Sequence, residues 1–206
     1  FIRSDGVKCK EFKKGGKRTM PHWIEFPVKD RASWNEFKKR LNPHSPIRYP
    51  LWWEEKKMIW ANRDYPLSIG GGSLYGWPRN WIGMENLAVM FYDDPMLVHD
   101  IMEYITEFII ATVQKAVQEV RIDFVMMWED MSFKSGPLIS PKLVREFMLP
   151  RYKRITSVFR SAGIDIIFLD SDGNVEELLP IWLEAGINGT FPLEICLLYT
   201  SPSPRD

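Results

Sequence analysis

Acidic side chains directly follow three short apolar runs of this chain, and they are the residues with the clearest capacity for chemistry. The runs are 122–128, 164–169 and 187–192, and the acids that follow them are Glu129, Asp130, Asp170, Asp172 and Glu194. Carboxylates held close together repel one another, which raises some of their pKa values and creates general acids. We therefore predict catalytic roles for Glu129, Asp130, Asp170 and Asp172, substrate binding by Glu194, and a divalent-cation site at Asp170 and Asp172.

The runs themselves have the length and the Ile-rich composition of strands that are buried on both faces of a sheet. Asp94-Pro95 opens a helical pattern that continues to Glu119, and Ser140-Pro141 opens another that stops at Gly163. Consecutive βα units predict a parallel sheet, and acids at the carboxyl ends of several strands are typical of a (β/α)8 barrel. The predicted fold is therefore α/β, a partial TIM barrel that contains only its central portion. An open flavodoxin-like sheet is the alternative.

Helix capping is the competing explanation for the acids near residue 170. Asn174 and Glu177 have the spacing of a capping box, with Asn in the place of Ser or Thr, and they predict a helix that runs to 185 and bends near Pro180. If Asn174 supplies the cap, Asp170 and Asp172 are free for a functional role.

An aromatic segment follows the glycine run 70–72 and contains a single arginine. We expect residues 73–81 to form a loop, in which Arg79 is available for a substrate carboxylate. Tyr75, Arg79 and Trp81 are the predicted substrate-binding residues of this loop. The alternative is a packed surface loop with no ligand.

The N-terminal third predicts smaller elements. Turn signals at Asp5-Gly6 and Gly15-Gly16 indicate a β-hairpin excursion within residues 1–28. Short helices are predicted at 34–41, capped by Ser33, and at 51–62.

Composition limits the class of protein. The 206 residues are 45% hydrophobic and carry 27 basic and 27 acidic side chains, which argues against nucleic-acid binding driven by phosphate neutralisation. The two cysteines form no disulfide framework, and no apolar run approaches the roughly 18 residues of a membrane span. We expect a cytoplasmic protein with no membrane partner.

From about residue 122 to 194, together with the helix at Asp94-Pro95, the chain resembles the uroporphyrinogen decarboxylase (URO-D) superfamily. The resemblance lies in an ordered set of short motifs, which are Glu129-Asp130, Ile139-Ser140-Pro141, Leu149-Pro150-Arg151-Tyr152, Gly163-Ile164, Asp170-Ser171-Asp172-Gly173-Asn174, Glu184-Ala185-Gly186-Ile187 and Pro192-Leu193-Glu194. This superfamily contains the decarboxylase and methyltransferases that work with corrinoid proteins. The resemblance implies a (β/α)8 barrel and a small-molecule substrate.

Corrinoid-linked members of the superfamily typically bind zinc through a His-x-Cys at a strand end, where this chain has Asp170 and Asp172. Two carboxylates suit Mg²⁺ or Mn²⁺ better than zinc. We favour methyl transfer or demethylation linked to a corrinoid partner protein. The alternatives are decarboxylation of uroporphyrinogen, a lyase step of porphyrin biosynthesis, and a non-catalytic ligand-binding barrel. A homodimer is also compatible with the sequence.

Residues 1–195 are interpreted as one incomplete barrel domain. Residues 196–206 resemble translated sequencing-adapter read-through, so we expect the natural sequence to end near Glu194 or Ile195. Because an incomplete barrel exposes strand edges and apolar strand faces, we expect the isolated chain to aggregate or to be partly molten.

Overall fold

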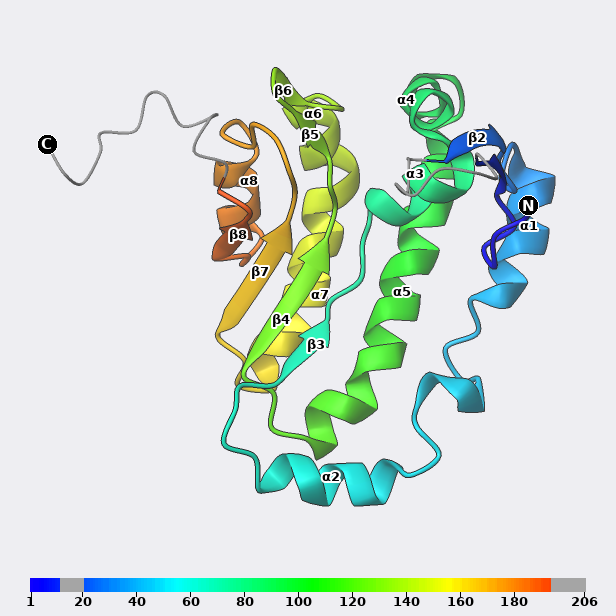
Figure 1. Cartoon of the computed structure of the whole chain (residues 1–206). Helices are drawn as coiled ribbons and strands as arrows, with labels where there is room; N and C mark the ends of the chain where they lie inside the picture. Colours follow the sequence, from blue (N-terminus) through cyan, green and yellow to red (C-terminus); the bar gives the residue numbers. More distant parts are fainter. Residues whose placement is uncertain (12–20, 194–206) are drawn as a thin grey trace, which may run out of the picture.

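The computed structural model describes residues 1–11 and 21–193 and is built on a four-stranded sheet (Figure 1). The strands are β3 (Ser68–Gly70), β4 (Phe124–Trp128), β7 (Ile166–Asp170) and β8 (Gly189–Phe191). Their order in the sheet follows the chain, β3-β4-β7-β8, and all three pairs are parallel. This order is that of a singly wound barrel segment, because a flavodoxin-like sheet reverses direction at a switch point. The prediction of a parallel α/β sheet is confirmed, and β3 and β8 form two edges that these four strands do not join into a closed barrel.

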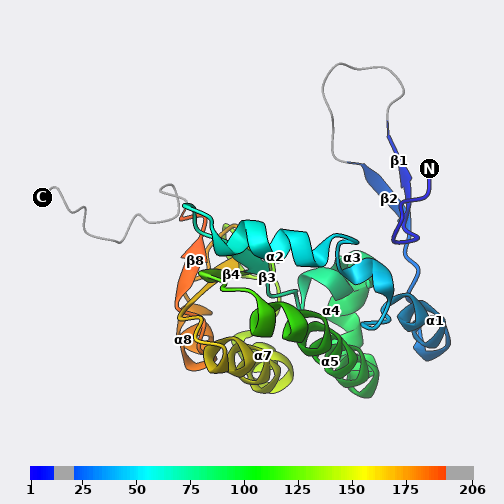
Figure 2. The same cartoon turned by 90° about the horizontal axis from the view of Figure 1, so that it is seen from below.

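Helices α5, α7 and α8 (Leu179–Glu184) lie on one face of this sheet (Figure 2). Helix α5 covers Pro95–Glu119, as predicted, and the Asp94 side chain caps it by accepting from the Leu97 N–H at 3.0 Å. The second predicted helix is divided into α6 (Pro141–Leu143), the π-helical segment η3 (Val144–Met148) and α7 (Leu149–Ser161). Pro150 directly follows the π-helical segment, in which the Leu149 N–H donates to the Val144 carbonyl five residues earlier, so the helix changes its hydrogen-bond spacing where the proline has no N–H.

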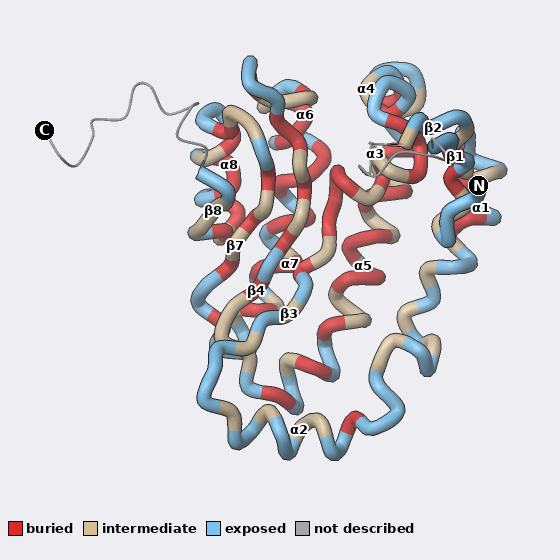
Figure 3. The backbone as a smooth tube through the Cα atoms, in the orientation of Figure 1, coloured by how far each residue is buried: buried red, intermediate tan, exposed pale blue. Residues whose placement is uncertain are grey.

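Burial alternates along β4 and β7, so the two faces of the sheet differ (Figure 3). Val125 and Ile167 are fully buried against the helices, and so are the other residues of that face. Side chains of the opposite face remain accessible, with Met126 at 39% and Ile166 at 47% exposure. Alternate residues of a strand point to opposite faces, so the same alternation determines the face to which each residue at a strand end points.

The remaining elements flank this core. They are β1 (Lys8–Lys10), β2 (His22–Glu25), α1 (Arg31–Phe37), η1 (Lys38–Arg40), η2 (Pro46–Arg48), α2 (Trp53–Ala61), α3 (Gly76–Ile82), α4 (Met84–Asp93), β5 (Ser132–Phe133) and β6 (Gly136–Pro137). Strands β1 and β2 pair antiparallel, as the predicted N-terminal hairpin requires. The Gly15-Gly16 turn lies outside the described residues. No helix in the described ranges combines the length and the apolar character of a membrane span.

Three local predictions from the N-terminal and middle parts were wrong. Helix α1 begins at Arg31, because Asp30 is its N-cap and Ser33 completes the capping box from inside the helix. Residues 73–81 are not a loop, since α3 starts at Gly76. The segment 131–138 follows an apolar run without helical or strand periodicity and therefore predicts a loop, but it contains the short antiparallel pair β5–β6.

The predicted capping box at Asn174 was also wrong. The Asn174 side chain accepts from the Glu176 N–H at 3.0 Å and closes a turn, and α8 begins only at Leu179. Pro180 therefore lies in the first turn of α8 rather than at a bend.

His99, on α5 where it packs against η3 and α7, is expected to make the stability of the protein depend on pH. The His99 ring stacks on Phe147 at 4.1 Å between ring centres, and its Nδ1 lies 3.4 Å from Arg151 Nη1. Desolvation and the Arg151 charge lower the pKa of His99, against the weaker opposing effects of Glu146 and Glu103. The folded protein therefore binds fewer protons than the unfolded chain below about pH 6.5, and stability falls as the pH drops through that range.

We expect His99→Gln to remove part of this acid sensitivity. The measurement is urea unfolding at a series of pH values from 7.5 to about 5. His44→Gln, at an exposed position, is the matched control and should keep the wild-type slope. Equal slopes for the wild type and His99→Gln would refute the assignment.

Candidate functional site

Glu129 is a fully buried carboxylate that holds the beginning of α3. Glu129 follows Val125 by an even number of residues, so its side chain points to the same side, toward the helices and away from the accessible face of the sheet. Its five hydrogen bonds come from Ser73 Oγ (2.7 Å), Tyr152 OH (2.7 Å) and the backbone N–H groups of Leu74 (2.8 Å), Tyr75 (2.7 Å) and Gly76 (3.1 Å). Burial raises the pKa of Glu129, and these donors oppose the rise. The residue thus connects the end of β4 to α3.

Gly76 permits this close approach because it has no side chain, so we expect substitutions at residue 76 to destabilise the protein. A Cβ at residue 76 would lie 2.8 Å from the Trp128 ring and 2.9 Å from Ser73 Oγ. Gly76→Ala should therefore lower the free energy of unfolding by about 1–3 kcal/mol. Gly70→Ala is the control, because no atom lies within 4 Å of its added Cβ. Urea unfolding of both variants tests this, and equal losses at the two positions would contradict it.

Asp130 and Arg79 form an ion pair at the carboxyl end of the sheet. Arg79 Nη2 donates to Asp130 Oδ2 at 2.9 Å, and the guanidinium also donates to the Asp130 backbone carbonyl. The same guanidinium lies 5.4 Å from the centre of the Trp128 ring. Asp130 adopts a φ of 43°, which is uncommon for a residue other than glycine. Arg79 is thus fixed by a carboxylate and an aromatic ring at the carboxyl end of the sheet.

Asp170 ends β7 directly opposite Trp128 in the parallel pair. Its backbone carbonyl accepts from the N–H groups of Glu129 (2.9 Å) and Asp130 (3.1 Å), which fixes the two strand ends together. Within residues 1–11 and 21–193, no side chain donates a hydrogen bond to the Asp170 carboxyl. Partial burial, then the charge of Asp172 and then that of Asp130, raises the pKa of the Asp170 carboxyl. A carboxyl with a raised pKa is suited to general-acid chemistry, and the catalytic role of Asp170 stays a prediction.

The predicted acids thus separate into two groups. The charges of Asp172 and Asp130 both raise the pKa of Asp170 at the carboxyl end of the sheet, whereas Glu129 points into the helix layer. The expectation that all four converge was wrong for Glu129. Its catalytic role stays a prediction, and Glu194 lies outside the described residues.

The predicted substrate residues occupy different environments. Tyr75 is fully buried, its hydroxyl has no hydrogen-bond partner within the described ranges, and burial raises its pKa to about 12. Trp81 is 9% exposed and packs against Phe37 at 4.8 Å between ring centres. Arg79 lies beside Asp130 with 15% of its side chain exposed. Substrate binding by these three residues stays a prediction.

The donor set does not fit zinc. Asp170 and Asp172 offer two carboxylates, and the described residues contain no group of three or more His, Cys, Asp or Glu side chains placed to hold a metal ion. Protein zinc sites use three or four protein ligands, most of them thiolate or imidazole. We therefore derive no chemical step through a metal at this position.

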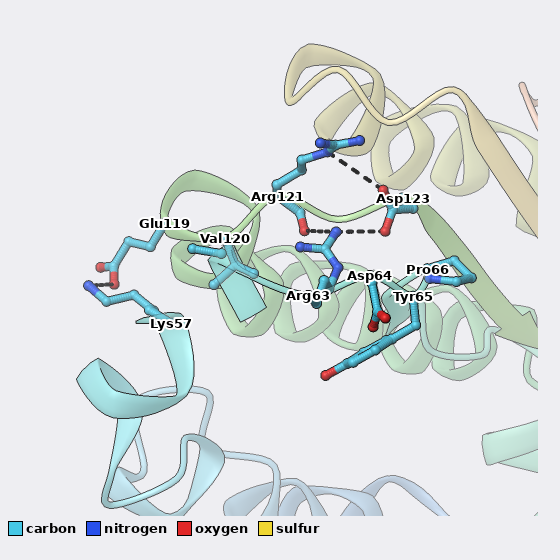
Figure 4. Close-up of a pocket in the computed structure, with 10 residues that line it drawn as sticks. Lys57, Arg63, Asp64, Tyr65, Pro66, Glu119, Val120, Arg121 and Asp123 are labelled. Atoms are coloured by element: carbon cyan, nitrogen blue, oxygen red, sulfur yellow. Dashed lines mark hydrogen bonds and ion pairs between the residues drawn. The ribbon is translucent and has the colours of Figure 1, made fainter. Parts of the chain in front are cut away.

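A separate cavity lies near the amino-terminal ends of the strands (Figure 4). It has a volume of about 610 Å³, and its wall contains Arg63, whose Nη2 pairs with Asp123 Oδ2 at 2.6 Å. Lys57 is paired with Glu119 at 3.1 Å across the same cavity. Because its cations are paired with carboxylates, and because the amino-terminal face of a barrel serves stability, we assign this region a structural role.

Sequence reasoning missed Trp128 and the partners of Glu129. The alternation along β4 could have indicated that Trp128 shares a face with Met126, opposite to Glu129. No sequence signal connects Arg79 to Asp130, or Tyr152 to Glu129, because these contacts join separate elements.

The parallel sheet, its one-sided helix layer and the acids at its carboxyl end define a partial TIM-barrel-like α/β protein. The family model described as uroporphyrinogen decarboxylase (URO-D) matches residues 79–191, which is more than half of the chain. The chain therefore belongs to the URO-D family.

A solved structure of a methyltransferase from Methanosarcina mazei is also similar. The two chains share 17% sequence identity with a TM-score of 0.55, and the similarity covers 90% of this chain and 52% of the methyltransferase. At this identity the similarity shows the fold, and the chain spans about half the length of that protein. No curated protein matches the chain.

Proposed function

We propose that the protein is an enzyme of the URO-D family that removes a methyl group from a small molecule and transfers it to a corrinoid carried by a partner protein. The observation that carries this proposal is the Asp170 carboxyl, which has a raised pKa, lacks a side-chain donor in the described ranges and lies opposite Trp128. Such a group is suited to protonate a leaving atom. The similarity to a methyltransferase supports the choice of reaction.

The proposed step is a heterolytic methyl transfer. The bond between the methyl carbon and its oxygen, nitrogen or sulfur breaks, and the heteroatom keeps the electron pair. Asp170 donates a proton to that heteroatom, so the demethylated product leaves neutral. A reduced corrinoid on the partner protein would supply the electron pair for the new bond to the methyl carbon. Trp128 offers an aromatic surface beside the acid, and Arg79, fixed by Asp130, orients an anionic substituent of the substrate.

Decarboxylation of uroporphyrinogen is the second candidate, because the matching family model bears that name. A ligand-binding barrel without turnover is the third, from a different class. Both share the carboxyl-end location of the site but do not require proton transfer from Asp170 to a demethylated product.

The test is an incubation of the protein with reduced cobalamin and a panel of methyl ethers, methylamines and methyl thioethers. We expect at least one methyl donor to methylate the cobalamin, which is detected as a change in the absorption spectrum of the cobalamin. Asp170→Asn should abolish this spectral change. Ligand binding without methylation of cobalamin by any donor would favour the non-catalytic alternative.

A further inference from the structure

A closed network of contacts connects the buried Glu129 carboxylate to the ion pair of Arg79 and Asp130. The Glu129 carboxylate accepts from the Tyr75 N–H at 2.7 Å, and the Tyr75 carbonyl accepts from the Arg79 N–H at 2.9 Å. The Arg79 guanidinium donates to Asp130 Oδ2 at 2.9 Å, and Asp130 directly follows Glu129 in the chain. A displacement of the Glu129 carboxylate would therefore move both partners of the ion pair.

The backbone of Asp130 is held in an uncommon conformation within this network. Its φ is 43°, and a residue other than glycine keeps such a conformation only where the surrounding structure fixes it. The Asp130 N–H donates to the Asp170 carbonyl at 3.1 Å, and the Asp130 carbonyl accepts from Arg79. Backbone conformations of this kind are concentrated at sites where a side chain must be placed accurately.

Tyr152 connects the network to helix α7. Its hydroxyl donates to Glu129 Oε1 at 2.7 Å, and both side chains are fully buried. Within the described residues, no hydrogen bond or ion pair joins Tyr152 directly to Arg79 or Asp130. Any effect of the Tyr152 hydroxyl on Arg79 must therefore pass through the Glu129 carboxylate.

We propose that Tyr152 and Glu129 are positioning residues for Arg79. They fix the start of α3 and the end of β4, so that the Arg79 guanidinium meets Asp130 with two of its five N–H donors and keeps the others for a substrate carboxylate. This inference rests on the proposed role of Arg79 in orienting an anionic substituent. It defines the substrate class more closely, because methyl donors with a carboxylate should depend on Tyr152 and neutral donors should not.

A double-mutant cycle between Tyr152→Phe and Arg79→Gln tests this connection without any substrate. Urea unfolding gives the unfolding equilibrium constant of the wild type, of each single variant and of the double variant. Because the two side chains do not contact each other, a purely structural role of the Tyr152 hydroxyl predicts independent effects. We expect instead that the constant of the double variant lies at least about fivefold below the value that independent effects would give.

Tyr104→Phe is the matched control for this cycle. The Tyr104 hydroxyl also donates to a backbone carbonyl, that of Lys38 at 3.3 Å, but lies outside the network, so its loss should be independent of Arg79→Gln. If Tyr152→Phe does not fold, Ser73→Ala takes its place, because Ser73 Oγ donates to the same carboxylate at 2.7 Å. Independent effects of Arg79→Gln and of the variant that removes the donor would overturn the proposal.

The methyl-transfer assay separates this inference from the proposed function. For methyl ethers that carry a carboxylate, Tyr152→Phe should raise KM about tenfold with little change in kcat, and it should leave the kinetics of neutral ethers unchanged. Equal losses for both kinds of donor would overturn the positioning role. If the wild type used no methyl donor, the proposed function would fail, and the double-mutant cycle would still decide whether Tyr152 positions Arg79.

Discussion

Replacing Glu129 with leucine is expected to lower the free energy of unfolding by about 3–5 kcal/mol, the loss typical of removing one partner from a buried charged network. Glu129 is fully buried and accepts five hydrogen bonds, three of them from the first N–H groups of the α3 region. Leucine fills the volume but leaves these donors unpaired in the interior, where each unsatisfied group costs about 1–3 kcal/mol.

Two further variants sharpen this prediction. Glu129→Gln keeps one side-chain oxygen as an acceptor and should lose less stability than Glu129→Leu. Glu176→Leu, at an exposed position, should stay within about 0.5 kcal/mol of the wild type. Urea unfolding of the three variants provides the comparison. If Glu129→Leu were as stable as Glu176→Leu, the structural role of the buried carboxylate would be excluded.

Replacing Asp170 with asparagine is expected to reduce methyl transfer by about 100- to 10,000-fold, the usual contribution of a general acid. Asparagine keeps the size of the side chain but cannot donate an acidic proton. Asp165→Asn is the matched control, because Asp165 is exposed at the opposite end of the same strand. The variants should bind substrate equally well, so the loss should lie in kcat rather than in KM.

The pH dependence of the reaction provides a readout that a structural role would not change. A general acid must be protonated, so the rate should fall as the pH rises through the raised pKa of Asp170. Asp172 contributes to that rise, because its negative charge disfavours ionisation of Asp170. Asp172→Asn should therefore move this limb of the pH–rate profile to lower pH. An unchanged limb would show that another group is the acid.

The sequence was sufficient where local signals agree with the tertiary structure. Asp94-Pro95 placed the first turn of α5 correctly, because an acidic cap and a proline in the first turn are local features. The apolar runs predicted β4 and β7, and the parallel arrangement of these strands placed Asp130 and Asp170 at one edge.

Long-range contacts decided what the sequence could not predict. Helix α3 contains glycine, proline and tryptophan, a composition that suggests a loop, and its own N-cap residue provides no side-chain cap. Glu129, 53 residues from Gly76, supplies the acceptor instead. The position of Glu129 after an apolar run suggested a catalytic role, because its contact with Gly76 depends on the tertiary structure. At Asn174 the capping-box spacing was misleading, because the Asn174 side chain closes a turn and α8 begins only at Leu179.

We propose that the acids at the carboxyl end of the sheet serve methyl transfer rather than porphyrin decarboxylation. The most direct measurement compares the two reactions on one preparation of the protein, with the methyl-donor panel plus reduced cobalamin in one arm and uroporphyrinogen in the other. Methylation of cobalamin that is lost in Asp170→Asn, with no carbon dioxide released from uroporphyrinogen, is the predicted result. Release of carbon dioxide from uroporphyrinogen, with every methyl donor left intact, would contradict the account.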